Sequence, residues 1–292
     1  MCLAAWSIQQ HERFPWVLAS NRDEFFARPT APLGWWQPSV DGQEILSGRD
    51  LEAGGSWLGV TRHGRLALVT NVREPGRFTA NALSRGSLVT AGLAADQVDA
   101  AWLDKVTEAP RNGFNFLAAD LFTGECAWAT NRTPQYRQVG AGLYGLSNAS
   151  LDTPWPKVTM LKEKLSDVLR FGADINVVDV SNTNDGINVN VAANAIADQL
   201  FAALANPQIA ADAVLPQTGV PLERERLLSS AFIRIADEGK AQAVYGTRCS
   251  TVVIAERVGD AKNATKIVRM FERVFDASGQ VSSNTALQFE VV

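Results

Sequence analysis

The sequence predicts a layered α+β protein with antiparallel sheets. Strand-like segments come first, helical segments with apolar faces occupy the middle of the chain, and strand-like segments return near its end. This order is typical of helices packed on antiparallel sheets around one core. A chain of 292 residues is an ordinary length for such a domain, and we expect one domain over residues 1–292.

Three pairs of strand-like segments predict three β-hairpins, because each pair is joined by a short polar or glycine-containing link. They cover residues 2–7 and 16–21, residues 57–61 and 66–71, and residues 114–121 and 125–130. Between the first two hairpins, residues 28–55 are rich in Pro and Gly and contain Trp35 and Trp36. The length of this segment predicts a functional loop.

Helical periodicity marks the middle of the chain. Residues 87–95 and on to 102 are predicted to be helical, and residues 157–170 place apolar side chains three or four residues apart on one face. The Ala-rich residues 191–204 predict another helix, after a polar insert around residues 178–190. Residues 250–256 and 266–271 then predict two final strands.

Composition excludes several classes of function. The net charge of −4 and the scattered basic residues argue against nucleic-acid binding, and no apolar run reaches the length of a membrane span. The first residues make a poor signal peptide, so we expect a cytoplasmic protein. Three cysteines at these spacings match neither a disulfide framework nor a zinc pattern, and two histidines make a metal site or a Ser-His-Asp triad improbable.

The candidate reactive group is Cys2. Removal of Met1 would leave a residue that carries both a thiol and a free α-amine. The amine titrates near about 7.7–8 and a thiol near about 8.5, so the amine can serve as the base that activates the thiol, and no histidine is needed. The alternative is inert packing of a buried cysteine, which position alone favours.

The expected register of the first hairpin supports a catalytic role for Cys2. If Ser7 pairs near Trp16 or Leu18, the antiparallel register places Cys2 opposite residues 21–23. Asp23 would then lie within reach of the N-terminus, and Arg22 would offer a planar set of donors to an anionic substrate or to Glu24. A solvated turn after a strand is the alternative for this polar run.

Polar groups also end other strands. Asn71 and Asn148 each follow an apolar segment, and either amide could donate a hydrogen bond to a developing oxyanion or simply stabilise a turn. Arg248 precedes a β-branched strand, where an edge salt bridge is the commoner role.

These motifs occur together and in order. They are Met1-Cys2, Asn21-Arg22-Asp23-Glu24, Arg28-Pro29, Gly54-Gly55-Ser56-Trp57-Leu58-Gly59, Ser84-Arg85-Gly86, Asn148 with Leu151-Asp152-Thr153-Pro154-Trp155-Pro156-Lys157, and Tyr245-Gly246-Thr247-Arg248. Over nearly its whole length the chain resembles the NRDE family, also called the transport and Golgi organisation protein 2 family. The resemblance implies an N-terminal-nucleophile hydrolase-like fold, a four-layer αββα sandwich with two antiparallel sheets.

The resemblance also implies roles for individual residues. In residue pattern the chain is similar to the choloylglycine and penicillin V acylases, although it has Ser20 where those enzymes carry an Arg. The implied catalytic residues are Cys2, Asp23, Asn71, Asn148 and Arg248. The charged and aromatic motif residues expected to bind the substrate are Arg22, Glu24, Arg28, Trp57 and Arg85.

Two functions follow from the resemblance. The first is hydrolysis of an amide or thioester of a small acyl substrate by Cys2, with no cofactor and no metal required. The second is binding and trafficking of haem, lipid or acyl-CoA in the same cleft without turnover, since eukaryotic relatives are linked to haem movement and lipid homeostasis. Five early tryptophans, Trp6, Trp16, Trp35, Trp36 and Trp57, could line an apolar cleft, although tryptophans are more often core. A scaffold with a vestigial site is the third alternative.

Overall fold

The computed structural model describes residues 2–40, 42–108, 110–132, 135–172, 191–236, 243–259 and 264–292. Two seven-stranded antiparallel sheets dominate it. Across the first sheet the order is β10 (Gly142–Leu146), β1 (Cys2–Ile8), β2 (Trp16–Phe25), β12 (Ala243–Val258), β13 (Thr265–Phe275) and β14 (Val281–Glu290), with β11 (Arg234–Ala236) beside β12. Across the second it is β3 (Thr30–Trp36), β4 (Ile45–Asp50), β5 (Leu58–Thr61), β6 (Arg65–Asn71), β7 (Phe114–Asp120), β8 (Cys126–Thr130) and β9 (Gln135–Gln138).

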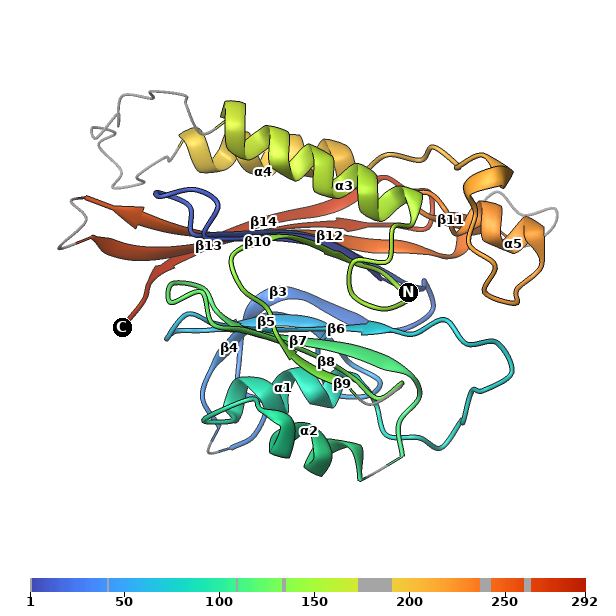
Figure 1. Ribbon diagram of the computed structural model, residues 1–292, viewed down its shortest axis with the longest axis horizontal. Helices are drawn as coiled ribbons and strands as arrows, with labels where there is room; N and C mark the ends of the chain where they lie inside the picture. The colour runs from blue at the N-terminus through green and yellow to red at the C-terminus, as the bar shows by residue number, and fades with distance from the viewer. Residues whose placement is uncertain are drawn as a thin grey trace.

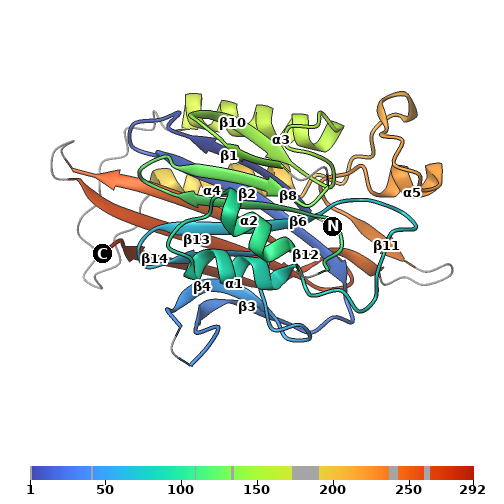
Figure 2. The same ribbon diagram turned by 60° about the horizontal axis from the view of Figure 1, so that its bottom comes forward.

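Helices cover the outer face of each sheet. The helices α3 (Pro156–Asp167) and α4 (Val191–Leu204) lie on the first sheet, and α1 (Gly86–Ala94) and α2 (Ala100–Thr107) lie on the second (Figures 1 and 2). The short helix α5 (Leu222–Leu227) lies at one end. The predicted four-layer αββα sandwich is therefore confirmed. No helix of the described residues has the length and apolarity needed to cross a bilayer.

Three apolar clusters fill the spaces between the layers. One lies between the sheets and contains Trp6, Trp16 and Trp128, one packs β1, β2 and β12 against α3 and α4, and one packs the second sheet against α1 and α2. Strand β1 is buried along its whole length because one face meets the second sheet and the other meets the helices. Burial on both faces explains why its sequence shows no polar alternation.

The predicted hairpins form, and the first has the expected register. Ser7 pairs with Val17 and Cys2 pairs with Arg22, so the N-terminal cysteine lies opposite the middle of the predicted range. The second and third hairpins correspond to β5–β6 and β7–β8. Helix α3 and helix α4 also form where periodicity predicted them.

The prediction of a long functional loop over residues 28–55 was wrong, because the segment contains β3 and β4. Strand β3 lies at the edge of its sheet, where Pro32 is tolerated beside a register shift between Ala31 and Gly34. The predicted helical run to residue 102 is broken in two, since Asp99 caps a new helix by accepting a hydrogen bond from the Trp102 N–H. The polar insert at residues 178–190 lies outside the described residues.

Candidate functional site

A cavity of about 360 Å³ opens where β1 and α1 begin and β2 and β6 end. It is lined by a motif-rich set of side chains. Eight of the ten residues predicted for the site are among them: Cys2, Arg22, Asp23, Glu24, Arg28, Trp57, Asn71 and Arg85. The fold thus gathers residues from five separate sequence motifs, together with Asn71, at one cavity, which we call the Cys2 cavity.

Cys2 stands at the start of β1 and is 9% exposed, more than Cys126 or Cys249. Burial raises the pKa of its thiol and the Asp23 charge adds to this rise, whereas the positive amino terminus of the unprocessed chain and Arg22 lower the pKa. The backbone N–H of Asp23 also donates to the sulfur, which favours the thiolate. Cys2 is therefore a shielded thiol with three nearby groups that stabilise its anion.

Asp23 lies next along β2 from Arg22, so its side chain points to the opposite face of the sheet, towards the helices. Its Oδ1 accepts a hydrogen bond from Thr247 Oγ1 at 2.8 Å. Burial raises the pKa of Asp23, and the Lys157 ammonium is the largest influence that lowers it. The positive amino terminus of the unprocessed chain is the next influence that lowers the pKa of Asp23, in line with the predicted position of Asp23 within reach of the N-terminus.

Lys157 is a member of the site that sequence reasoning missed. It lies in the first turn of α3, is 3% exposed, and its Nζ donates to the Leu228 carbonyl at 2.9 Å. A fully buried lysine is rare unless it is paired. The sequence did contain a signal for Lys157. It ends the motif Trp155-Pro156-Lys157 and is the first residue on the apolar face of the following helix, where a charged side chain is unexpected.

Arg22 shares the face of β2 that Cys2 occupies on β1, because directly paired residues of antiparallel strands point the same way. Its guanidinium lies 4.3 Å from the centre of the Trp57 ring and 3.8 Å from an Asp50 oxygen. Arg22 on the first sheet thus stacks on the ring of the residue that directly precedes β5 of the second sheet.

Two asparagines lie where a hydrogen bond connects the end of β6 to the segment after β10. Asn71 ends β6 and lines the Cys2 cavity, whereas Asn148 is buried behind it and donates from Nδ2 to the Asn71 carbonyl at 2.8 Å. Ser147 donates to the Cys2 carbonyl at 2.9 Å and Thr70 donates to the Ser147 carbonyl. The segment 147–148 therefore positions both Cys2 and Asn71, and of the two asparagines Asn71 is the one that lines the cavity.

The rim of the cavity depends on a close backbone contact. A Cβ atom on Gly55 would lie 2.4 Å from the Gly86 carbonyl carbon, so only glycine fits there. The Ser56 N–H donates to the Gly86 carbonyl at 3.2 Å. This contact holds the first turn of α1, and with it Arg85, beside Trp57.

Arg28 and Arg85 differ in their partners. The Arg28 Nε donates to Asp50 at 2.8 Å and its Nη1 donates to Glu52 at 2.8 Å, so two carboxylates balance its charge. Burial by itself would raise the pKa of Asp50, but the hydrogen bond from Arg28 outweighs burial and the pKa is lowered. Arg85 donates to the Gly113 carbonyl at 3.3 Å, and no ion pair to it occurs among the described residues. Arg85 is the cation best placed to meet an anion in the cavity.

The structure does not bring Arg248 to the Cys2 cavity. Thr247 pairs with Asp23 and Cys249 pairs with Arg22, so Arg248 is the extra residue of a β-bulge. Its Nη1 lies within hydrogen-bond distance of the Phe25, Phe26 and Arg28 carbonyls. The side chain thereby stabilises the turn that connects the two sheets, and it lines a separate cavity of about 130 Å³ beyond Trp57.

The other candidate ligands lie elsewhere. Of the five early tryptophans only Trp57 lines the Cys2 cavity. His11 accepts hydrogen bonds from the Arg13 and Phe14 N–H groups in a turn, and His63 is exposed beside the C-terminus. Among the described residues no group of three or more His, Cys, Asp or Glu side chains is arranged as a metal site.

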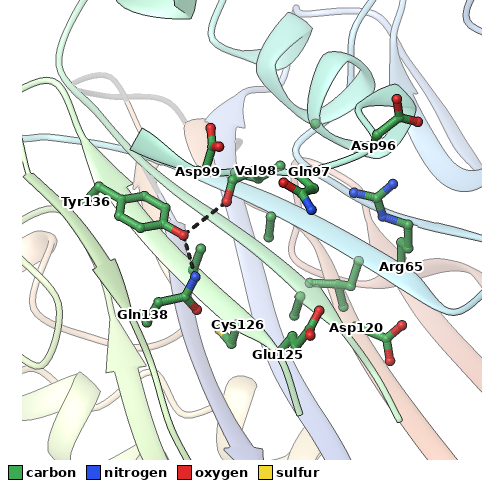
Figure 3. Close-up of a pocket in the computed structure, with 15 residues that line it drawn as sticks. Arg65, Asp96, Gln97, Val98, Asp99, Asp120, Glu125, Cys126, Tyr136 and Gln138 are labelled. Atoms are coloured by element: carbon green, nitrogen blue, oxygen red, sulfur yellow. Dashed lines mark hydrogen bonds between the residues drawn. The ribbon is translucent and has the colours of Figure 1, made fainter. Parts of the chain in front are cut away.

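A further cavity of about 590 Å³ lies on the outer face of the second sheet, near the connection between α1 and α2 (Figure 3). None of the predicted site residues lines it. Two of its four acidic residues have structural partners, since Asp99 caps α2 and Asp120 accepts from the Phe122 and Thr123 N–H groups. Tyr136 donates to the Val98 carbonyl. The Cys2 cavity is therefore the better candidate for chemistry.

Comparison with known proteins identifies the chain's relatives. Solved structures similar to it include a mutant of conjugated bile acid hydrolase from Clostridium perfringens, with 10% identity over 98% of this chain and 92% of that one at a TM-score of 0.42. Another is an N-acylethanolamine-hydrolyzing acid amidase ortholog of Caenorhabditis elegans, with 11% identity over 87% and 92% at a TM-score of 0.45.

Sequence relatives are more similar. The Transport and Golgi organization protein 2 homolog of Bos taurus is 32% identical over 83% of each chain, and the Homo sapiens homolog is 40% identical over 50% of this chain and 55% of its own. The family model described as Transport and Golgi organisation 2 matches residues 1–275. The chain therefore belongs to the Transport and Golgi organisation 2 family.

Proposed function

We propose that this protein is a cysteine N-terminal-nucleophile hydrolase that acts on an amide or thioester of a small acyl substrate. The observation that carries the proposal is the position of Cys2 in an open cavity, with the Asp23 N–H on its sulfur and Arg22 beside it. Neither Cys126 nor Cys249 lines this cavity, and burial raises the pKa of both thiols well above the usual range.

The proposed reaction has two stages. After removal of Met1, the α-amine of Cys2 takes the proton of its own thiol, and the thiolate attacks the substrate carbonyl carbon. The Asn71 side chain donates to the resulting oxyanion. The leaving amine or thiol departs with the proton from the α-amine, which leaves an acyl-thioester on Cys2. Water, deprotonated by the same amine, then releases the acyl group as a carboxylic acid.

The mouth of the cavity supports an acyl substrate. Phe78 is 74% exposed and Leu83 is 51% exposed, and both line the Cys2 cavity. Exposed apolar side chains beside a polar pocket favour a ligand with an apolar portion. In the proposed complex the acyl chain contacts Phe78 and Leu83 while the carbonyl reaches Cys2.

The pH dependence of alkylation at Cys2 tests this proposal without a known substrate. The thiolate is the reacting form, and burial raises the pKa of Cys2, so the labelling rate by iodoacetamide should rise through the alkaline range. A cation directly on Cys2 lowers that pKa. The mature protein should therefore be labelled at lower pH than a form carrying an N-terminal extension, as mass mapping of the adduct would measure. Equal profiles, or no adduct at Cys2, would contradict the proposal.

Carriage of haem or a lipid in the same cavity is the second candidate, favoured by the exposed Phe78 and Leu83 at its mouth. Since neither histidine lies at the cavity, the axial ligand would have to be Cys2. A titration with haem at micromolar protein should then shift the Soret band in wild type but not in Cys2→Ala. An unchanged spectrum with wild type would reject haem carriage through Cys2.

A further inference from the structure

We propose that the cavity of about 130 Å³ beyond Trp57 is a second binding site, which takes a small molecule with a carboxylate at one end and an amine at the other, as in the small amino acids. We call it the Arg248 cavity. It lies between β3 of the second sheet and β12 and β13 of the first, with apolar walls from Ala31, Pro32 and Val274. Of the described residues that line it, Trp57 alone also lines the Cys2 cavity, so the inference goes beyond the chemistry proposed there.

One end of the Arg248 cavity carries a guanidinium with unused donors. Among the described residues, the hydrogen bonds of Arg248 all come from Nη1 and end on three backbone carbonyls between Phe25 and Arg28. The Nε atom is buried without an acceptor, and no described carboxylate forms an ion pair with the side chain. A buried donor without an acceptor costs free energy, and the edge of an arginine that carries Nε and Nη2 fits both oxygens of a carboxylate. Arg248 therefore favours a ligand with a carboxylate.

The other end carries a carboxylate that can accept a further bond. Glu272 is 2% exposed, and its Oε1 accepts from the Leu33 N–H at 2.7 Å. This N–H is available because Leu33 lies in the register shift of the edge strand β3, where it pairs with no residue of β4. The Cys249 thiol also forms a hydrogen bond with Glu272. Since a carboxylate has about four lone-pair directions, Glu272 can also accept from an amine in the cavity.

The strands hold these two groups apart. Arg248 adjoins Cys249, which pairs with Val274 on β13. Glu272 lies two residues before Val274 on the same face, about 7 Å away along the strand. Opposite charges that line one cavity without pairing with each other match the two ends of one ligand. The volume limits that ligand to roughly the space of four water molecules, which a small amino acid fits.

Calorimetric titration with alanine, propionate and ethylamine tests the chemical class, because propionate lacks the amine of alanine and ethylamine lacks its carboxylate. Alanine should bind the wild-type protein at least about tenfold more tightly than either, since each missing group removes a charge-assisted hydrogen bond. Glu272→Gln should lower the affinity for alanine to that for propionate. The matched control Glu290→Gln makes the same change at an exposed residue of β14 and should leave alanine binding unchanged. Equal affinities for the three probes, or equal losses in the two variants, would overturn the proposal.

The location of the ligand is tested by NMR. The Arg248 Nε–H should give a ¹⁵N signal, assigned by its absence in Arg248→Lys, and alanine should shift this signal until the site is saturated. Val274→Phe keeps the arginine but fills the cavity, so alanine should no longer bind. A signal that alanine does not shift, or a Val274→Phe protein that binds alanine like wild type, would place the ligand elsewhere and refute the site. None of these measurements uses the thiol of Cys2, so their outcome is independent of the proposed hydrolase activity.

Discussion

Replacement of Cys2 by Ala removes turnover of any amide or thioester that the wild-type protein hydrolyses. The expected loss in kcat is on the order of 10⁴-fold or more, as for removal of a nucleophile that no other group can replace. Only Cys2, among the three cysteines, lies in the cavity with Arg22 and Asn71. A panel of fluorogenic amides and thioesters of increasing acyl length would find the substrate, and steady-state kinetics would measure the loss.

The matched control is Cys126→Ala. Cys126 is buried in β8 beside the cavity on the outer face of the second sheet, so its removal should leave kcat unchanged. Both variants keep the fold if their thermal midpoints stay close to wild type. A Cys2→Ala protein that still turns over the substrate at the wild-type rate would show that another group is the nucleophile.

Replacement of Arg73 by Met should cost about 3–5 kcal/mol in the free energy of unfolding. The Arg73 Nη1 lies 2.5 Å from a Glu225 oxygen, and the two side chains are 6% and 4% exposed. Removal of the guanidinium leaves a buried carboxylate whose remaining hydrogen bonds, within the described part of the chain, come from Thr218. Urea denaturation followed by circular dichroism would give the change, provided that the slope of the transition stays constant.

Two comparisons check the cause of that loss. The double variant Arg73→Met/Glu225→Gln removes both charges and should recover part of the stability, because a neutral pair has no buried charge to compensate. Arg226→Met breaks the exposed pair between α5 and Asp212 and should change stability little. If Arg73→Met proved as mild as Arg226→Met, the buried pair would not contribute to folding as argued.

The parts of the fold that could be predicted are those with local patterns. The first hairpin follows from two apolar runs and the link between them, and its register brings Cys2 opposite Arg22. Helix α3 follows from apolar residues at helical spacing. Strand β14 was not predicted because most of its residues are exposed. Its sequence therefore shows only a weak alternation of apolar and polar residues. Strand β3 was hidden by Pro32, which its edge position tolerates.

The motifs that form the candidate site could be predicted from the sequence, but not which of their residues line the cavity and which lie behind it. Sequence order does not distinguish Asn71, which lines the cavity, from Asn148, which is hydrogen-bonded behind it. Nor does it reveal Lys157, since the burial of a charged residue depends on the packing of α3 against the first sheet. The role of Arg248 depends on the shift in register at the bulge, which only strand pairing shows.

The bulge at Arg248 means that substituting this residue and deleting it are different experiments. Substitution removes the bonds to the three turn carbonyls and leaves the pairing of β12 intact. Deletion would remove the bulge itself, and Thr247 and Cys249 would become consecutive residues that keep Asp23 and Arg22 as their partners. Thr247 would then still face Asp23. A single-residue gap at this place in a related sequence would therefore indicate a straighter β12 and a turn between the sheets without its arginine, with the same residues opposite Asp23 and Arg22.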